Sequence, residues 1–136
     1  FVFALSVYSK KNVIRGLHFQ KKKQQSKLVI VIDGKLIDYC VDLRKKSKNY
    51  LKEYKNKLNK NSILFIPKGF AHGYLVLKEN TIVHYKCTDY YNPNSEYGIK
   101  WDDPDLNIPW GILNPTLSEK DSRLPFLKEQ MFLPKI

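Results

Sequence analysis

The sequence has little cysteine, with only Cys40 and Cys87 in 136 residues. Neither belongs to a CxxC pair, so the sequence predicts no disulfide framework and no structural zinc site. We expect two buried, reduced thiols, which are typical of proteins of the cytoplasm. The sequence therefore indicates a cytoplasmic protein.

Long apolar runs are also absent. No run reaches about 18 residues, the length that a transmembrane helix needs, so we expect no membrane partner. The apolar start, Phe1 to Leu5, is too short for a signal peptide and has no basic leader. It also lacks an initiator Met, so we expect a chain whose natural N-terminus is missing.

Acidic residues are scarce, because 13 Asp and Glu face 24 Lys and Arg and give a net charge of +11. Such a balance favours anionic partners, either a nucleic acid or a small molecule with a diphosphate. The lysines gather in Lys21–Lys23 and Lys45–Lys60, and runs of this kind are usually solvated faces. No zinc finger, RNP or helix-turn-helix pattern accompanies them, so we expect no nucleic-acid partner.

What is present is strand periodicity. β-branched and aromatic runs bounded by turn residues predict strands at Lys27–Ile32, Lys35–Leu43, Asn49–Tyr54, Ser62–Ile66, Gly73–Leu77 and Thr81–Thr88. Asp33-Gly34 is typical of a tight hairpin, and Lys57–Ser62 predicts a polar turn. Short strands separated by turns predict one all-β sandwich or barrel domain, which this length can fold.

Beyond Asn92 the character of the chain changes. Six of the seven prolines lie in this part, and they disfavour long helices. We expect an irregular, Pro-rich C-terminal segment that wraps the barrel, with one short helix near Ser118 to Ser122.

Histidine is rare as well, occurring only as His18, His72 and His84. A metal site of the kind common in β-barrels needs a second histidine two residues after the first, but Gln20 follows His18. No carboxylate comes before Asp33, so the set of ligands is incomplete and we expect no metal.

Acid–base chemistry is the remaining use for these histidines. A histidine oriented by a carboxylate makes a general base, and a tyrosine on the opposite side can return a proton. Strand alternation places Tyr85 and Cys87 on one face of their strand. A role for the tyrosines as core and rim aromatics stays open at this point. A lysine or arginine near the site would stabilise an enolate oxygen.

Five segments in this order resemble the dTDP-4-dehydrorhamnose 3,5-epimerase family, which has a cupin-type (jelly-roll) β-barrel. They are Arg15–Gln20, Gly69–Gly73, Tyr85–Tyr91, Trp101–Asp105 and Leu117–Asp121. The resemblance runs from about Lys11 to Pro125 and implies one cupin-type domain over residues 1–136. It also implies epimerisation at carbons 3 and 5 of a dTDP-linked 4-keto-6-deoxy sugar, with a nucleotide-diphosphate sugar as substrate, no cofactor, and a homodimer.

The resemblance also implies roles for single residues. His18 would be the catalytic base, Asp121 its carboxylate partner and Tyr85 the general acid. The substrate-binding residues would be Arg15, Gln20, Lys27, His72 and Tyr91. Lys27 would hold the enolate oxygen, and the ketone of the substrate would itself supply the activation.

Two departures from the family leave alternatives open. The family carries a further N-terminal stretch that binds the diphosphate and exchanges strands between subunits, and it has polar residues where this chain has Phe3-Ala4-Leu5. We therefore expect either a truncated chain or a divergent member. The alternatives are a single-carbon epimerase, an epimerase of a GDP-linked 4-keto heptose, a 4-keto sugar ketoisomerase, and a non-catalytic sugar-nucleotide-binding cupin.

Overall fold

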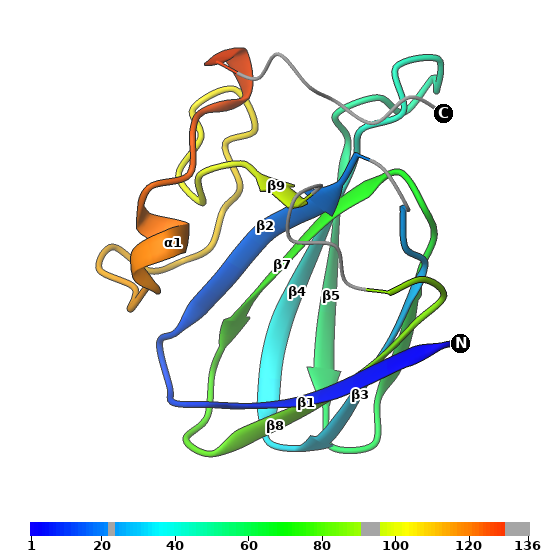
Figure 1. Cartoon of the computed structure of the whole chain (residues 1–136). Helices are drawn as coiled ribbons and strands as arrows, with labels where there is room; N and C mark the ends of the chain where they lie inside the picture. Colours follow the sequence, from blue (N-terminus) through cyan, green and yellow to red (C-terminus); the bar gives the residue numbers. More distant parts are fainter. Residues whose placement is uncertain (22–23, 91–95, 130–136) are drawn as a thin grey trace.

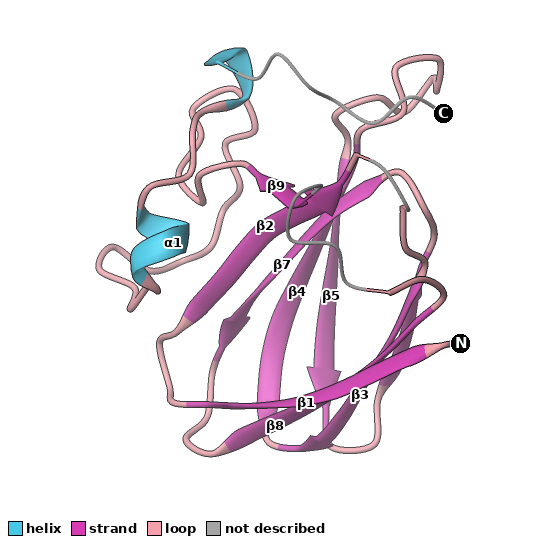
Figure 2. Cartoon of the chain, in the orientation of Figure 1, coloured by secondary structure: helices cyan, strands magenta, loops and turns pink. Residues whose placement is uncertain are grey.

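The computed structural model describes residues 1–21, 24–90 and 96–129, and most of its regular structure is β-strand (Figures 1 and 2). The elements in chain order are β1 (Phe3–Ser9), β2 (Ile14–Gln20), β3 (Lys27–Asp33), β4 (Lys35–Asp42), β5 (Glu53–Asn59), β6 (Ile63–Ile66), β7 (Phe70–Val76), β8 (Thr81–Cys87), β9 (Glu96–Gly98), α1 (Glu119–Ser122) and the 3-10 turn η2 (Leu127–Glu129).

The strands form two antiparallel sheets. The larger sheet has the order β5-β4-β7-β2-β9, and the smaller has the order β1-β8-β3-β6. Neighbours in a sheet are far apart in the sequence, as in β1 beside β8 and β2 beside β7, and this is the pattern of a jelly roll. The predicted all-β barrel is confirmed, and the short helix expected near Ser118 to Ser122 is α1.

Alternation along the strands divides the core into two parts. Residues such as Val29, Val83 and Val76 fill the space between the two sheets. Leu17 and Phe19 of β2 point to the other side of the larger sheet, where Trp110 and other residues of the C-terminal segment cover them. Residues after β9 therefore lie against the outer side of β2 (Figure 1).

The hairpin expected at Asp33-Gly34 is wrong. β3 pairs with β6 and β8, whereas β4 pairs with β5 and β7, so the chain turns a corner from one sheet into the other. Gly34 has a φ of +99°, and a Cβ there would lie 2.7 Å from the Cα of Thr81. The glycine is thus needed for a close approach at a corner, a role that a local turn signal does not distinguish from a hairpin.

The strand expected over Asn49–Tyr54 and the turn over Lys57–Ser62 are displaced. The strand is β5, Glu53–Asn59, which lies at the edge of the larger sheet and, within the described part of the chain, pairs only with β4. Leu58 is its one buried residue, and charged side chains such as Lys55 and Lys57 point to solvent. An exposed edge strand with lysines has the composition of a turn, so its sequence does not distinguish the two.

Within the described part of the chain, no helix is both long and apolar enough to cross a membrane.

Candidate active site

A cavity of about 480 Å³ opens between β1 and β8 on one side and β2 and β7 on the other. Both sheets and the C-terminal segment contribute to its wall. The lining residues are Phe3, Leu5, Val7, Arg15, His18, Gln25, Lys27, His72, Tyr74, Tyr85, Cys87, Glu96, Ser118, Lys120 and Asp121. Of the eight site residues expected from the sequence, six are in this wall.

An irregularity in β2 lets Arg15 and His18 face the same cavity. Residues three apart on a regular strand point to opposite sides, but the register of β2 against β7 shifts between these two residues. Gly16, with a φ of +117°, lies at the shift, where a Cβ would be 2.6 Å from the Cα of Gly73. Two glycines facing each other thus allow the bend that brings the arginine and the histidine together.

His18 and Asp121 are hydrogen-bonded to each other in the cavity wall. Nε2 of His18 lies 2.6 Å from Oδ1 of Asp121, and Oδ2 accepts a hydrogen bond from the Gly16 amide at 3.1 Å. Ser118 caps α1 by accepting the Asp121 amide, which fixes the start of that helix. The histidine side chain is 28% exposed and the carboxylate 5%. The imidazole is therefore accessible to a ligand while its carboxylate partner is covered.

The same contacts keep the carboxylate ionised. Burial opposes the charge of Asp121, but the hydrogen bond with His18, the positive charge that this imidazole carries when protonated, and the Gly16 amide together lower the pKa of the carboxyl below its usual value. An ionised Asp121 stabilises an imidazolium at His18, so the pair has the arrangement of a general base with its orienting group.

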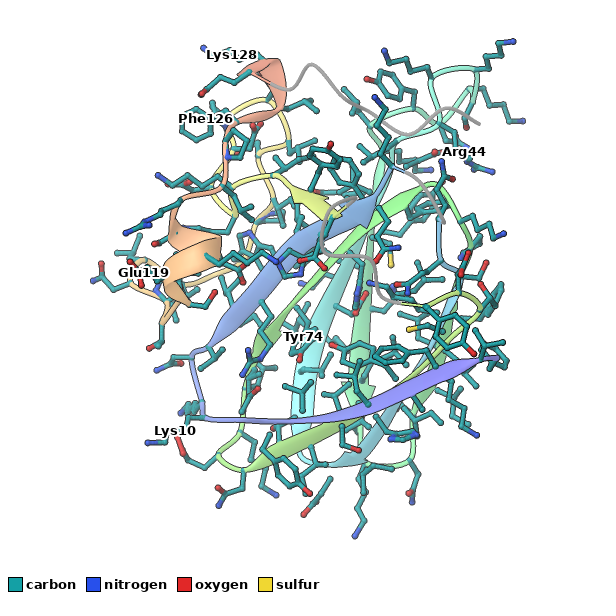
Figure 3. All side chains as sticks on the ribbon, viewed as in Figure 1. Lys10, Arg44, Tyr74, Glu119, Phe126 and Lys128 are labelled. Carbon is teal, nitrogen blue, oxygen red and sulfur yellow. The ribbon has the colours of Figure 1, made fainter. Side chains whose placement is uncertain are left out.

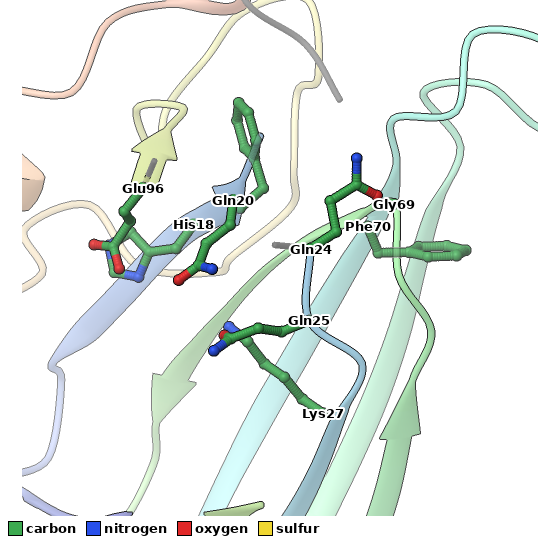
Figure 4. A pocket seen from close by; sticks show the side chains of 9 residues that line it. His18, Gln20, Gln24, Gln25, Lys27, Gly69, Phe70 and Glu96 are labelled. Carbon is green, nitrogen blue, oxygen red and sulfur yellow. The ribbon is translucent and has the colours of Figure 1, made fainter. Parts of the chain in front are cut away.

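Lys27 enters the cavity from β3, beside Cys87 on the neighbouring strand. Burial lowers the pKa of its ammonium group, while the negative charge of Glu96 acts in the opposite direction. Gln20 and Gln25 line a small adjoining recess of about 30 Å³, and Figure 4 shows His18, Gln20 and Glu96 on one side of it with Gln25 and Lys27 on the other. Gln20 thus lies at the recess and not in the main cavity.

His72 belongs to a second buried pair. Its Nε2 is hydrogen-bonded to Oδ2 of Asp38, a residue that the sequence analysis did not single out. Oδ1 of Asp38 accepts a hydrogen bond from the Cys40 thiol at 3.2 Å, and burial, together with this carboxylate, raises the pKa of that thiol. An aspartate on the inward-facing side of the apolar run Lys35–Leu43 was the signal that could have identified this residue.

Tyr85 faces the cavity from β8, in the sheet opposite that of His18. Cys87 lines the cavity too, so the two residues share one face of the strand as the alternation predicted. The ring of Tyr85 lies 6.2 Å from that of His72 and 6.4 Å from that of Tyr74. Burial, with the nearby Tyr74 and Asp38, raises the pKa of the Tyr85 hydroxyl well above 10, so the phenol stays protonated. Tyr91, the remaining predicted residue, lies outside the described residues.

Two further charged residues reach the cavity. Lys120 of α1 and Glu96 of β9 form an ion pair next to His18. Lys120 is part of the Leu117–Asp121 segment. Its position next to Asp121 in the sequence was the signal that could have identified it as a cavity residue. Within residues 1–21, 24–90 and 96–129, no three His, Cys, Asp or Glu side chains gather closely enough to hold a metal ion, and both cysteines are free and buried.

Comparison with protein families gives a match to dTDP-4-dehydrorhamnose 3,5-epimerase over residues 1–129. The dTDP-4-dehydrorhamnose 3,5-epimerase of Methanothermobacter thermautotrophicus is 46% identical over 126 residues, which are 89% of this chain and 68% of the relative. That of Escherichia coli is 43% identical over 135 residues, or 94% of this chain and 71% of the relative. The chain thus spans about two thirds of the length of these two relatives.

Solved structures agree with this match. The dTDP-6-deoxy-D-glucose-3,5-epimerase of Legionella pneumophila, in complex with dTDP-4-keto-L-rhamnose, superposes with a TM-score of 0.94 at 39% identity, covering 100% of this chain and 75% of that one. The dTDP-4-dehydrorhamnose 3,5-epimerase of Bacillus anthracis, with TDP and PPi bound, gives 0.91 at 44% identity, covering 93% and 75%.

Proposed function

The chain belongs to the dTDP-4-dehydrorhamnose 3,5-epimerase family, and we propose that it epimerises carbons 3 and 5 of a dTDP-linked 4-keto-6-deoxy sugar with His18 as base and Tyr85 as acid. The observation that carries the proposal is the pairing of His18 with Asp121 on one wall of a cavity whose opposite wall holds Tyr85. As a member of this family the chain is an isomerase.

The chemistry follows from the ketone at carbon 4, which acidifies the protons on carbons 3 and 5. His18 removes one of these protons, and the ionised Asp121 stabilises the imidazolium that results. The enolate oxygen then carries the charge, and the ammonium group of Lys27, a cation of the cavity wall, holds it.

Inversion requires that the proton returns from the other side of the sugar ring. Tyr85 is held neutral by its raised pKa and lies on the opposite wall, so it donates its proton to that face of the enolate. His72, fixed by Asp38, and Arg15 bind the sugar nucleotide beside this centre. The substrate's own ketone provides the activation, and we propose no cofactor.

The test is proton exchange. The protein is incubated in D₂O with dTDP-4-keto-6-deoxyglucose, and deuterium entry is followed by NMR. Entry at both carbons 3 and 5 with inversion is expected. Entry at one carbon would favour a single-carbon epimerase. Movement of the keto group to carbon 3 would favour a ketoisomerase. Binding without exchange would favour a sugar-nucleotide-binding cupin. If the protein exchanged protons only when given a GDP-linked 4-keto heptose, it would be an epimerase of that substrate.

We also propose that the active form is a homodimer of a cytoplasmic protein. The outer face of the smaller sheet carries Leu28, Ile30 and Ile32 of β3 beside Ile63 and Phe65 of β6, and we call this group the β3–β6 face. Ile63, Phe65 and Ile32 are 63%, 55% and 47% exposed. A contiguous apolar surface on a folded protein commonly marks an association site, and a second copy offers a matching apolar surface.

A further inference from the structure

Strand β1 forms an apolar part of the cavity wall that the mechanism above does not use. Phe3, Leu5 and Val7 line the cavity, because alternation turns every second residue of this strand inward. Figure 3 shows β1 crossing in front of β4 and β7 of the larger sheet. Leu5 is 38% exposed although it lines the cavity, so its side chain offers apolar surface that a ligand can cover.

The register of the smaller sheet places this apolar surface beside the proposed acid. Leu5 is the cross-strand partner of Tyr85. Two residues along, Phe3 is the partner of Cys87, and Cys87 is in turn the partner of Lys27 on β3. Partners on one face of an antiparallel sheet have Cβ atoms about 4.5 to 5.5 Å apart. The acid, the cation and the inward side chains of β1 therefore form one continuous wall.

The proposed reaction determines which groups of the sugar meet this wall. A ring carbon carries its hydrogen and its substituent on opposite sides of the ring. His18 removes the hydrogens of carbons 3 and 5, so these hydrogens point toward the larger sheet, and the substituents of both carbons lean toward the wall that holds Tyr85. The substituents are a hydroxyl on carbon 3 and a methyl group, carbon 6, on carbon 5. The wall thus meets one polar and one apolar group.

These two groups need different surroundings. The hydroxyl loses its hydrogen bonds to water on binding and needs polar atoms in exchange, which Lys27 and Tyr85 supply. The methyl group is stabilised when apolar surface covers it. The inward side chains of β1 offer such surface and no hydrogen bond, so they match the methyl group and not the hydroxyl.

We propose that Leu5, flanked by Phe3 and Val7, is a specificity-determining residue that binds the methyl group on carbon 5 and makes the cavity selective for 6-deoxy sugars. This inference rests on the proposed function. A hydroxyl on carbon 6 would lie against side chains that cannot hydrogen-bond to it, so a 6-hydroxylated sugar would lose contacts with water without replacement. The contact is made in the bound substrate before any proton moves, and it therefore acts on KM more than on kcat.

The test compares two sugar nucleotides that differ only in an oxygen on carbon 6. Wild-type protein and Leu5→Asn are assayed by deuterium entry with dTDP-4-keto-6-deoxyglucose and with dTDP-4-ketoglucose. We expect kcat/KM of the wild-type protein to be about 10- to 100-fold higher on the 6-deoxy sugar. Leu5→Asn should reduce this ratio by about fivefold or more, mainly through a higher KM for the 6-deoxy sugar. An unchanged ratio, or a wild-type protein without preference, would overturn the assignment.

Two further variants separate this role from a structural one. Ala4→Asn adds the same amide on the outward, exposed face of the same strand, so the ratio should stay as in wild-type protein. Leu5→Ala shortens the apolar side chain without adding a polar group, and it should raise KM for the 6-deoxy sugar about 3- to 10-fold with kcat retained. The proposal is wrong if Ala4→Asn reduces the ratio as much as Leu5→Asn does, or if Leu5→Ala lowers kcat equally for both sugars.

Failure of the proposed function is recognisable separately. If wild-type protein exchanges no protons in either sugar, the epimerase proposal fails, and calorimetric binding of the same two sugar nucleotides replaces turnover as the readout. The Kd of the wild-type protein should then be about 10- to 100-fold lower for the 6-deoxy sugar, and Leu5→Asn should remove most of this difference. Equal Kd values for the two sugars, or no binding of either, would contradict the role of Leu5.

Discussion

Nε2 of His18 lies 2.6 Å from Oδ1 of Asp121, although 103 residues separate the two in the sequence. The other oxygen of the carboxylate accepts the amide of Gly16, so the backbone of β2 holds the partner of its own histidine. One carboxylate thus fixes both the bend of the strand and the orientation of the imidazole. This dual contact leads to the first prediction.

Asp121→Asn should lower kcat about 100- to 10,000-fold and change KM little, because an amide cannot stabilise the imidazolium at His18. Deuterium entry into the keto sugar measures the effect. The control Ser118→Ala removes the cap of α1 but keeps the carboxylate, so it should reduce stability by about 1 kcal/mol with most of the activity retained. The double variant His18→Asn/Asp121→Asn should be no slower than His18→Asn alone, and multiplied losses would argue against a dyad.

Tyr85→Phe should separate exchange from inversion. His18 still forms the enolate in this variant, but the proton donor of the opposite wall is gone. Deuterium should therefore enter from the His18 side with the starting configuration retained, whereas wild-type protein gives deuterium with inversion. NMR coupling constants at carbons 3 and 5 distinguish the two products. Inversion at the wild-type rate would exclude Tyr85 as the acid.

Lys27→Met should make the protein more stable and less active. Burial lowers the pKa of Lys27 from its usual value of 10.5, so the folded protein holds this proton less tightly than the unfolded chain does. The free energy of unfolding of the wild-type protein therefore rises as the pH increases from the lowered pKa of Lys27 to 10.5. The methionine variant has no group that titrates at this position, so it lacks this pH-dependent rise. Thermal midpoints at neutral and alkaline pH measure it.

The same variant should lose most of its turnover, because the ammonium group that holds the enolate oxygen is then gone. In wild-type protein the activity should fall on the alkaline side at a pH below that of an ordinary lysine, as the ammonium group loses its proton. A Lys27→Met protein that is both less stable and fully active would contradict this role.

Phe65→Glu combined with Ile63→Lys should give a monomer. These two side chains lie on the β3–β6 face, and charges there oppose burial against a second copy. Light scattering coupled to gel filtration gives the mass at several concentrations. The control Lys57→Glu changes a charge on β5, in the other sheet, and should leave the mass unchanged. A wild-type protein that is monomeric at all concentrations would end the dimer proposal.

Local patterns predicted most of the strands because alternation is a property of neighbouring residues. They could not predict that Gly34 lies at a corner between sheets, since this depends on Thr81 and the strands around it. The edge position of β5 was hidden for a similar reason, because its lysines contact solvent and its partner lies on β4.

The candidate site divides in the same way. His18, Tyr85 and Lys27 belong to segments whose pattern or family resemblance indicated them, and the structure brings them to one cavity. Asp38 was missed because its importance arises from burial, which the sequence does not state. A buried carboxylate or hydroxyl is recognised only when its surroundings are known.

The contact between β2 and α1 also affects how the protein matures. A growing chain must extend through Asp121 before His18 can meet its partner, and contacts between residues so distant in sequence form late and slowly in β-rich folds. A nascent or partly folded chain with its barrel complete would still lack the carboxylate that orients the imidazole. Turnover of the sugar can therefore serve as an assay for the completion of folding, with sensitivity that the far-ultraviolet signal of the strands does not offer.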